Sequence, residues 1–143
     1  MTQNMNEYLW EDLNIGLSSS FSAKITEEML ENFLTYSGDH NPIHIDKSYA
    51  EEHGFKDRVV HGLLVASFYS TLVGVRLPGK HSFLHEINVA FLEPVFIDDE
   101  LIIVGEITYL NNAYKQVEIR AEIKNKNGKK VSRAKIKVGI RRE

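Results

Sequence analysis

The sequence predicts an α+β domain in which four or five antiparallel strands surround one apolar helix. Two observations predict this class. The segment from Gly62 to Val75 carries no charged residue, which is typical of a helix buried in a protein core. The second half of the chain alternates apolar and polar residues with a period of two, as half-buried strands do. Because a single sheet needs a covering layer, the helix and the strands are expected to pack together.

The N-terminal part predicts a strand followed by a helix. Apolar residues alternate with polar or small ones on both sides of Ser18-Ser19-Ser20, which predicts a bent or bulged first strand: Leu13, Ile15, Leu17, Phe21, Ala23 and Ile25. Thr26 is a good helix cap, and the two glutamates that follow suit the positive end of a helix. Apolar residues at helical spacing continue to Ser37, so this helix delivers Asp39 at its end.

The residues after this helix predict a loop. A residue before proline is pushed out of the helical region, so Asn41-Pro42 disfavours a continuous helix. Asp39 and His44 lie five positions apart and would point away from each other in a helix. Both are therefore expected on the loop, with the Asn41 side chain holding it by hydrogen bonds to the backbone.

Two helices are predicted next. Asp46 caps a short helix over residues 47–53, which Gly54 ends. The apolar segment from Gly62 to Val75 follows, and Pro78-Gly79 ends it. Since this segment is apolar on every side, we expect it to be buried on every side.

The rest of the chain predicts strands. Alternating segments cover residues 87–92, 101–110, 117–124 and 133–141. Asn127-Gly128 predicts a hairpin with a two-residue turn between the last two. In the last strand the inward-facing residues are expected to be Ala134, Ile136, Val138 and Ile140.

An aspartate and a histidine on one loop are typical of acid–base catalysis, because such a pair holds a water between a proton acceptor and a proton donor. This is the machinery for adding water to an activated double bond or removing it. Gly62 would let a ligand oxygen approach the free amides at the start of its helix. From the residues alone, Asp39 as a simple turn former and Gly62 as a simple helix start remain open alternatives.

Two motifs carry a resemblance to a known family. Gly38-Asp39-His40-Asn41-Pro42-Ile43-His44, followed by Asp46 and then Val60-His61-Gly62-Leu63-Leu64-Val65-Ala66-Ser67, resembles the MaoC-like, (R)-specific enoyl-CoA hydratases over about residues 30–94. The resemblance implies a homodimeric hot-dog fold, in which an antiparallel sheet wraps around a central helix. It implies that Asp39 and His44 are catalytic, that the Gly62 amide forms an oxyanion hole and that Ser70 supports Asp39.

The implied reaction is the reversible syn addition of water to a trans-2-enoyl thioester, without a cofactor. The acyl group would ride on coenzyme A or on an acyl carrier protein, as in fatty acid metabolism. Ser70 and Val73 share a helix face and are candidates for setting the depth of the acyl pocket.

Two alternatives stay open. A hot-dog acyl thioesterase commonly uses an acidic residue on the central helix, and residues 62–75 contain none. A non-catalytic acyl-thioester-binding module would not need the Asp39 and His44 pair.

Composition narrows the remaining classes. A chain of 143 residues with 43% hydrophobic residues suits one domain over residues 1–143, with residues 1–8 expected to be a flexible tail. The net charge of −3 argues against nucleic acid or anionic membrane partners. Without cysteine there is neither a disulfide nor a thiol nucleophile, and the six histidines form no His-Glu-x-x-His pair, so no metal site is expected. No signal peptide or bilayer-length segment is visible, and we expect a cytoplasmic protein.

Overall fold

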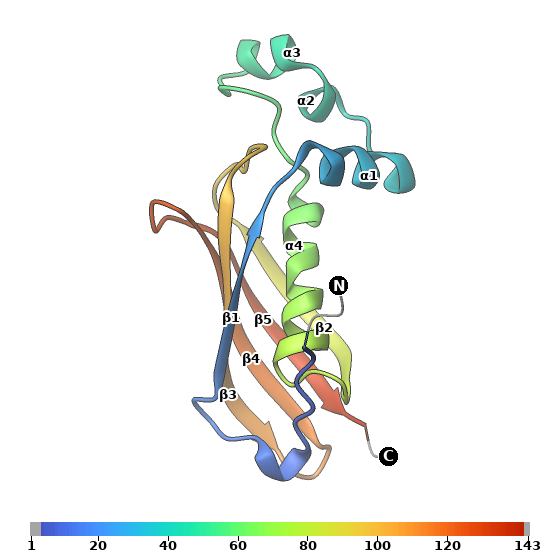
Figure 1. Ribbon diagram of the computed structural model, residues 1–143, viewed down its shortest axis with the longest axis vertical. Coiled ribbons are helices and arrows are strands. Elements are labelled where there is room, and N and C mark those ends of the chain that lie inside the picture. The colour runs from blue at the N-terminus through green and yellow to red at the C-terminus, as the bar shows by residue number, and fades with distance from the viewer. Residues whose placement is uncertain (1–3, 142–143) are drawn as a thin grey trace.

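The computed structural model describes residues 4–141. A five-stranded sheet runs along one helix, and three further helices gather at one end of the molecule (Figure 1). In chain order the elements are η1 (Trp10–Asp12), β1 (Ser18–Lys24), α1 (Glu27–Ser37), α2 (Pro42–Ile45), α3 (Lys47–Glu52), α4 (Gly62–Thr71), the π-helical turn η2 (Leu72–Arg76), β2 (Ser82–Phe91), β3 (Glu100–Asn111), β4 (Gln116–Asn125) and β5 (Lys130–Ile140).

The sheet confirms the predicted antiparallel architecture. The strand order is β1-β3-β4-β5-β2, and every neighbouring pair is antiparallel. A hairpin at Asn127-Gly128 joins β4 to β5 as predicted, but residues 126–129 form its loop, which is longer than the expected two residues. Gly128 has a φ of 79°, which favours glycine. Ala134, Ile136 and Val138 are buried as expected. The strands β1 and β2 form the two edges of the sheet.

The first strand differs from the expectation. The three serines do not interrupt it; they begin it, because Ser18, Ser19 and Ser20 pair with Glu106, Gly105 and Val104 of β3. Residues 13–17 instead form a turn. Pairing with β3 satisfies the backbone of the serines whatever their side chains prefer, so tertiary context overrides the local signal.

The helix α4 packs one side against the inner face of the sheet. Val65 and Tyr69 are buried there, within a core cluster shared with the strands. The expectation that this helix is buried on every side is wrong for the single chain. Leu63, Ser67 and Ser70 form an exposed stripe, and the Leu63 side chain is 68% exposed. The sheet covers only one side of a helix, so the other side is free to meet a second molecule.

The N-terminal residues also differ from the expected flexible tail over residues 1–8. Residues 1–3 lie outside the described part of the chain. The Asn6 amide donates to the Val75 carbonyl at 2.9 Å, the Lys80 amide donates to the Asn6 carbonyl at 2.8 Å, and Glu7 pairs with Lys80 at 3.1 Å. The segment around Asn6 is thus tied to the end of η2. Among residues 4–141, no helix has the length and apolarity needed to cross a bilayer.

Candidate active site

The helix α1 ends at the turn that carries Asp39. Thr26 caps its start, accepting a hydrogen bond from the Met29 amide at 3.2 Å, as predicted. Gly38 ends it with a φ of 73°, a left-handed conformation that glycine adopts without strain. The Asp39 carboxylate then accepts a hydrogen bond through Oδ1 from the Asn41 amide at 3.3 Å. Asp39 therefore does shape a turn, but this leaves its second oxygen, Oδ2, available.

His44 lies on a short helix and not on a loop, which corrects the sequence-based expectation. The helix α2 begins at Pro42, and proline is well tolerated at a first helical position because its missing N–H is not needed there. Asn41 caps the helix by accepting a hydrogen bond from the Ile43 amide at 3.1 Å. This confirms the predicted structural role of Asn41 and fixes the backbone that carries His44.

Asp39 and His44 face each other. The distance from Asp39 Oδ2 to His44 Nε2 is 3.7 Å, slightly longer than a direct hydrogen bond. The other ring nitrogen, Nδ1, lies 2.6 Å from the Val59 carbonyl. Because a carbonyl only accepts, Nδ1 carries a proton. Nε2, which faces Asp39, is then the ring atom of His44 that can accept or release a proton.

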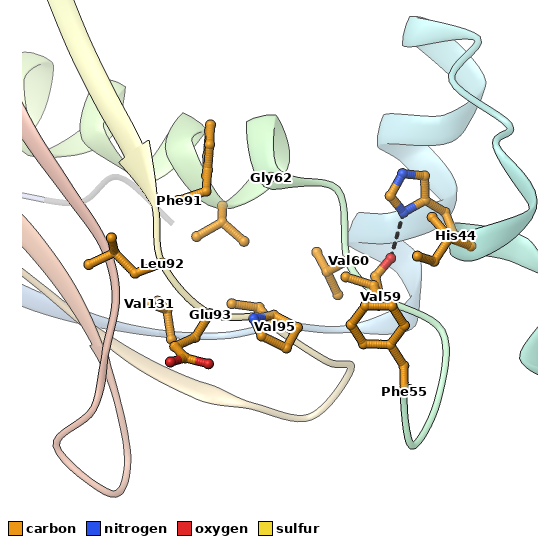
Figure 2. Close-up of a pocket in the computed structure, with 13 residues that line it drawn as sticks. His44, Phe55, Val59, Val60, Gly62, Phe91, Leu92, Glu93, Val95 and Val131 are labelled. Carbon is orange, nitrogen blue, oxygen red and sulfur yellow. Dashed lines mark hydrogen bonds between the residues drawn. The ribbon is translucent and has the colours of Figure 1, made fainter. Parts of the chain in front are cut away.

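A pocket of about 380 Å³ opens beside His44 (Figure 2). Figure 2 shows His44 at one end of the pocket, with Gly62 at the first turn of α4 between His44 and Phe91. The remaining walls are mostly apolar and come from the residues before α4, from α4 itself, from the segment after β2 and from β5. Asp39 does not line the pocket, but its carboxylate faces His44, which does.

The start of α4 offers a free amide at this pocket. Within residues 4–141 no hydrogen bond is made by the Gly62 amide, and the residue before it, His61, does not cap the helix with its side chain. The first amides of a helix carry partial positive charge. Gly62 is therefore placed to bind a negatively charged oxygen.

His61 is a site residue whose role the sequence did not reveal. Its side chain is only 2% exposed, and its Nε2 lies 2.9 Å from the Asp39 carbonyl. Its ring stacks on the ring of His44, with centroids 3.8 Å apart and planes 25° apart. The available signal was the position of this histidine between the apolar pair Val59-Val60 and the apolar helix, because a residue with apolar neighbours on both sides is expected to be buried.

Asp39, His44 and His61 each place one possible ligand atom within 4.8 Å of the others, which suggests a metal site. The orientation of the two histidine rings does not fit a metal site. A metal must lie close to the plane of each imidazole at about 2.0–2.1 Å from the nitrogen, and two rings stacked face to face have no such shared point. The Nε2 of His61 and the Nδ1 of His44 are also engaged by carbonyl oxygens.

Ser70 and Val73 do not line this pocket in the single chain. Ser70 lies eight residues beyond Gly62, about 12 Å along the helix at 1.5 Å per residue, on the exposed stripe of α4. Val73 is buried in the core. The pocket wall on α4 is formed by Gly62 and Val65.

A buried hydrogen-bond chain supports the end of β2, which carries Phe91. The Tyr69 hydroxyl donates to Ser132 Oγ at 2.9 Å, and Ser132 Oγ donates to the Ala90 carbonyl at 3.0 Å. Burial raises the pKa of Tyr69 to about 12, although the bond to Ser132 opposes this shift. This hydrogen-bond chain links α4, β5 and β2, and Ser132 and Ala90 are sequence neighbours of the pocket residues Val131 and Phe91.

Comparison with known proteins gives a consistent result. The family model "MaoC like domain" matches residues 15–138. The (R)-specific enoyl-CoA hydratase of Aeromonas caviae is 35% identical over 100 residues, covering 70% of this chain and 75% of the relative. The enzyme of the same name from Rhodospirillum rubrum is 34% identical over 113 residues, covering 79% of this chain and 78% of the relative. Hydratases are hydro-lyases.

The solved structure of the (R)-hydratase from A. caviae involved in PHA biosynthesis has the same fold. Its TM-score is 0.87 at 29% sequence identity, with 92% of this chain and 99% of that chain covered. This match agrees with the sheet order and the central helix described above. The chain therefore has the hot-dog fold and belongs to the MaoC-like dehydratase family.

Proposed function

We propose that this protein is an (R)-specific enoyl-CoA hydratase, which reversibly adds water to a trans-2-enoyl thioester to give an (R)-3-hydroxyacyl thioester. One observation carries the proposal: the Asp39 and His44 pair adjoins a pocket whose wall also holds the unpaired amide of Gly62. Family membership and the names of the relatives support it.

The free amide suits the charge that forms during this reaction. Conjugation with the thioester makes C3 of the substrate electrophilic, and attack by water oxygen at C3 moves negative charge onto the thioester carbonyl oxygen. The Gly62 amide, at the positive end of α4, would donate a hydrogen bond to that oxygen. One such donor is typically worth about 2.7–4 kcal/mol in the transition state.

The pair would supply the proton transfers. A water held between Asp39 Oδ2 and His44 Nε2 loses one proton as its oxygen bonds to C3, and one proton is delivered to C2 on the same face. Every atom of the water ends in the product and the reaction is redox-neutral overall, so it needs no redox cofactor. Acid–base help of this kind is typically worth about 10²–10⁴-fold in rate.

The walls of the pocket match an acyl chain. Val65, Phe91 and Val131 contribute apolar surface beyond the Gly62 amide. Coenzyme A and an acyl carrier protein present the same pantetheine arm to such a pocket, and the coenzyme A thioester is the substrate carried by the relatives' names.

A homodimer is part of this proposal. The outer edge of β2 is unpaired within residues 4–141, and exposed apolar side chains lie along it: Phe83, Leu84, Ile87 and Phe91. An edge of this kind is normally covered, and a second copy would cover it together with the exposed stripe of α4. Ser70 lies on that stripe, so its predicted support of Asp39 would be given to the partner's Asp39. Val73 stays a candidate for limiting acyl chains that extend along α4.

The alternatives fit less well. A thioesterase reaction would direct water at the carbonyl carbon, and residues 62–75 supply no carboxylate for it. A non-catalytic binding module gives no reason for Asp39 Oδ2 to be aimed at His44 Nε2.

One assay separates the three functions. The protein is incubated with a short trans-2-enoyl-CoA while the conjugated absorbance and the release of free thiol are followed, and the product is analysed for chirality. Loss of absorbance with the (R)-3-hydroxyacyl product and without thiol supports the hydratase. Thiol release would establish the thioesterase, and binding without either change would establish the binding module.

A further inference from the structure

We propose that His61 is a positioning residue that holds Asp39, His44 and the Gly62 amide in one arrangement. The inference rests on the proposed function and deepens it. No other side chain within residues 4–141 bonds to the Asp39 carbonyl while stacking on the His44 ring, and His61 is not itself among the residues that line the pocket.

The first contact fixes the turn that carries Asp39. The Asp39 carbonyl accepts a hydrogen bond from His61 Nε2 at 2.9 Å, and since a carbonyl only accepts, this nitrogen must carry the ring proton. The other nitrogen, Nδ1, is buried and has no hydrogen-bond partner in the described part of the chain. The bond to the Asp39 carbonyl therefore selects the tautomer of His61 with its proton on Nε2.

The second contact fixes the plane of His44. The His44 ring is held by the hydrogen bond from its Nδ1 to the Val59 carbonyl and by stacking on His61, with the two ring centroids 3.8 Å apart. His61 also contacts the ring of Phe33, with centroids 4.7 Å apart and the planes tilted by 46°. Phe33 belongs to α1, so these ring contacts tie His44 to the helix that delivers Asp39.

His61 also adjoins the oxyanion donor. It is the N-cap residue of α4. An N-cap side chain accepts from the second or third amide of a helix, but the His61 side chain is turned to Asp39 instead. The amide of Gly62, the first residue of the helix, makes no hydrogen bond within residues 4–141. Because His61 and Gly62 are adjacent in the chain, the same residue that orients the acid–base pair also sets its position relative to the oxyanion donor.

This coupling matters because catalytic groups must be held close to their productive geometry, within about 0.5 Å. A misplacement of about 1 Å can cost about 10²-fold in rate. His61 is thus expected to affect kcat without touching the substrate.

Two substitutions separate its contacts. His61→Phe keeps an aromatic ring beneath His44 but removes the donor to Asp39, whereas His61→Gln keeps an N–H group near the position of Nε2 and removes the ring. His53→Gln is the matched control. His53 also stacks on an aromatic ring, that of Tyr49, and lies within hydrogen-bond distance of a carbonyl, but it is exposed.

For hydration of a short enoyl-CoA, His61→Phe should lower kcat by about 10²-fold with KM changed less than about twofold. His61→Gln should recover about a tenth or more of the wild-type kcat, and His53→Gln should match the wild type. A wild-type kcat in His61→Phe would overturn the inference. It would also be overturned if both His61 variants lost the same share of kcat and that loss matched their loss of thermal stability.

A second measurement needs no activity. Nitrogen-15 NMR of the histidine rings in the wild-type protein should show His61 with its proton on Nε2 and His44 with its proton on Nδ1. The opposite tautomer at His61 would overturn the inference whether or not hydration is found. The expected tautomers in a protein that does not hydrate enoyl-CoA would support the arrangement and refute only the proposed reaction.

Discussion

The ring of Phe91 lies against the α-carbon of Gly62. A Cβ added to residue 62 would lie 3.1 Å from Cε1 of Phe91 and 3.2 Å from Cδ1. The end of β2 and the start of α4 thus meet at the proposed oxyanion donor, and a side chain at residue 62 would crowd the Phe91 ring. A glycine here avoids that contact and also gives a ligand oxygen access to the amide.

Gly62→Ala should therefore impair hydration. The added methyl group must displace Phe91 or the first turn of α4 by a few tenths of an ångström, and both line the pocket. We expect kcat/KM to fall by about tenfold or more, a loss of about 1.4 kcal/mol in transition-state binding. Gly74→Ala is the matched control, since a Cβ there would meet nothing within 4 Å. Equal kinetics for the two variants would remove Gly62 from the site.

The roles of Asp39 and His44 are tested by substitutions that keep their hydrogen bonds to the backbone. Asp39→Asn retains an oxygen for the Asn41 amide, and His44→Asn retains a donor for the Val59 carbonyl while removing Nε2. Each should reduce kcat by about 10²–10⁴-fold. The double variant should lose little more than either single variant, because the two groups act on one water. His40→Asn, at an exposed neighbour, should leave kcat unchanged. Normal turnover in either pair variant would contradict the mechanism.

The buried Tyr69 predicts a loss of stability at high pH. Its pKa is raised from 10.0 to about 12 in the folded protein. Folding therefore favours the protonated hydroxyl, and this stabilisation is complete below about pH 10 and is lost as pH rises towards 12. The contribution is of the order of 2–3 kcal/mol. Urea unfolding at a series of pH values should show a smaller decline in Tyr69→Phe than in the wild type. Parallel declines would show that Tyr69 does not cause it.

Tyr69→Phe should also weaken the protein near neutral pH. The Ser132 hydroxyl loses its donor, and a lost hydrogen bond of this kind typically costs about 0.5–1.5 kcal/mol. Urea unfolding at about pH 7 measures this cost. A more stable variant would mean that the hydrogen-bond chain through Ser132 does not support the fold.

The proposed dimer is tested at the edge of the sheet. Ile87→Glu places a charge on the exposed apolar side of β2 and should give a monomer in light scattering, because burying an unpaired carboxylate is costly. If Ser70 serves the partner's Asp39, the monomer should also lose hydration activity. Ile102→Glu, at an exposed isoleucine of β3, is the control and should remain a dimer. If the Ile87→Glu protein remains a dimer, the dimer interface does not include this edge of β2.

Much of this protein was predictable from local patterns. The capping of α1 by Thr26, the position of the hairpin at Asn127-Gly128 and the inward residues of β5 follow from short-range rules, and the structure confirms each of them. The loop prediction for His44 was wrong because Pro42 was treated as a helix breaker, whereas it begins the one-turn helix α2. The serines of β1 were misread because their partner, β3, lies more than eighty residues away in the sequence.

The sequence alone determined that an aspartate and a histidine follow one helix and that a glycine begins another, since these features depend on near neighbours in the chain. Only the tertiary structure decided that Asp39 Oδ2 faces His44 Nε2, that Val59 selects the tautomer of His44 and that His61 lies between the two motifs. Hydrogen bonds and ring contacts between residues far apart in the chain have no periodic signature, so they are settled only when the segments pack together.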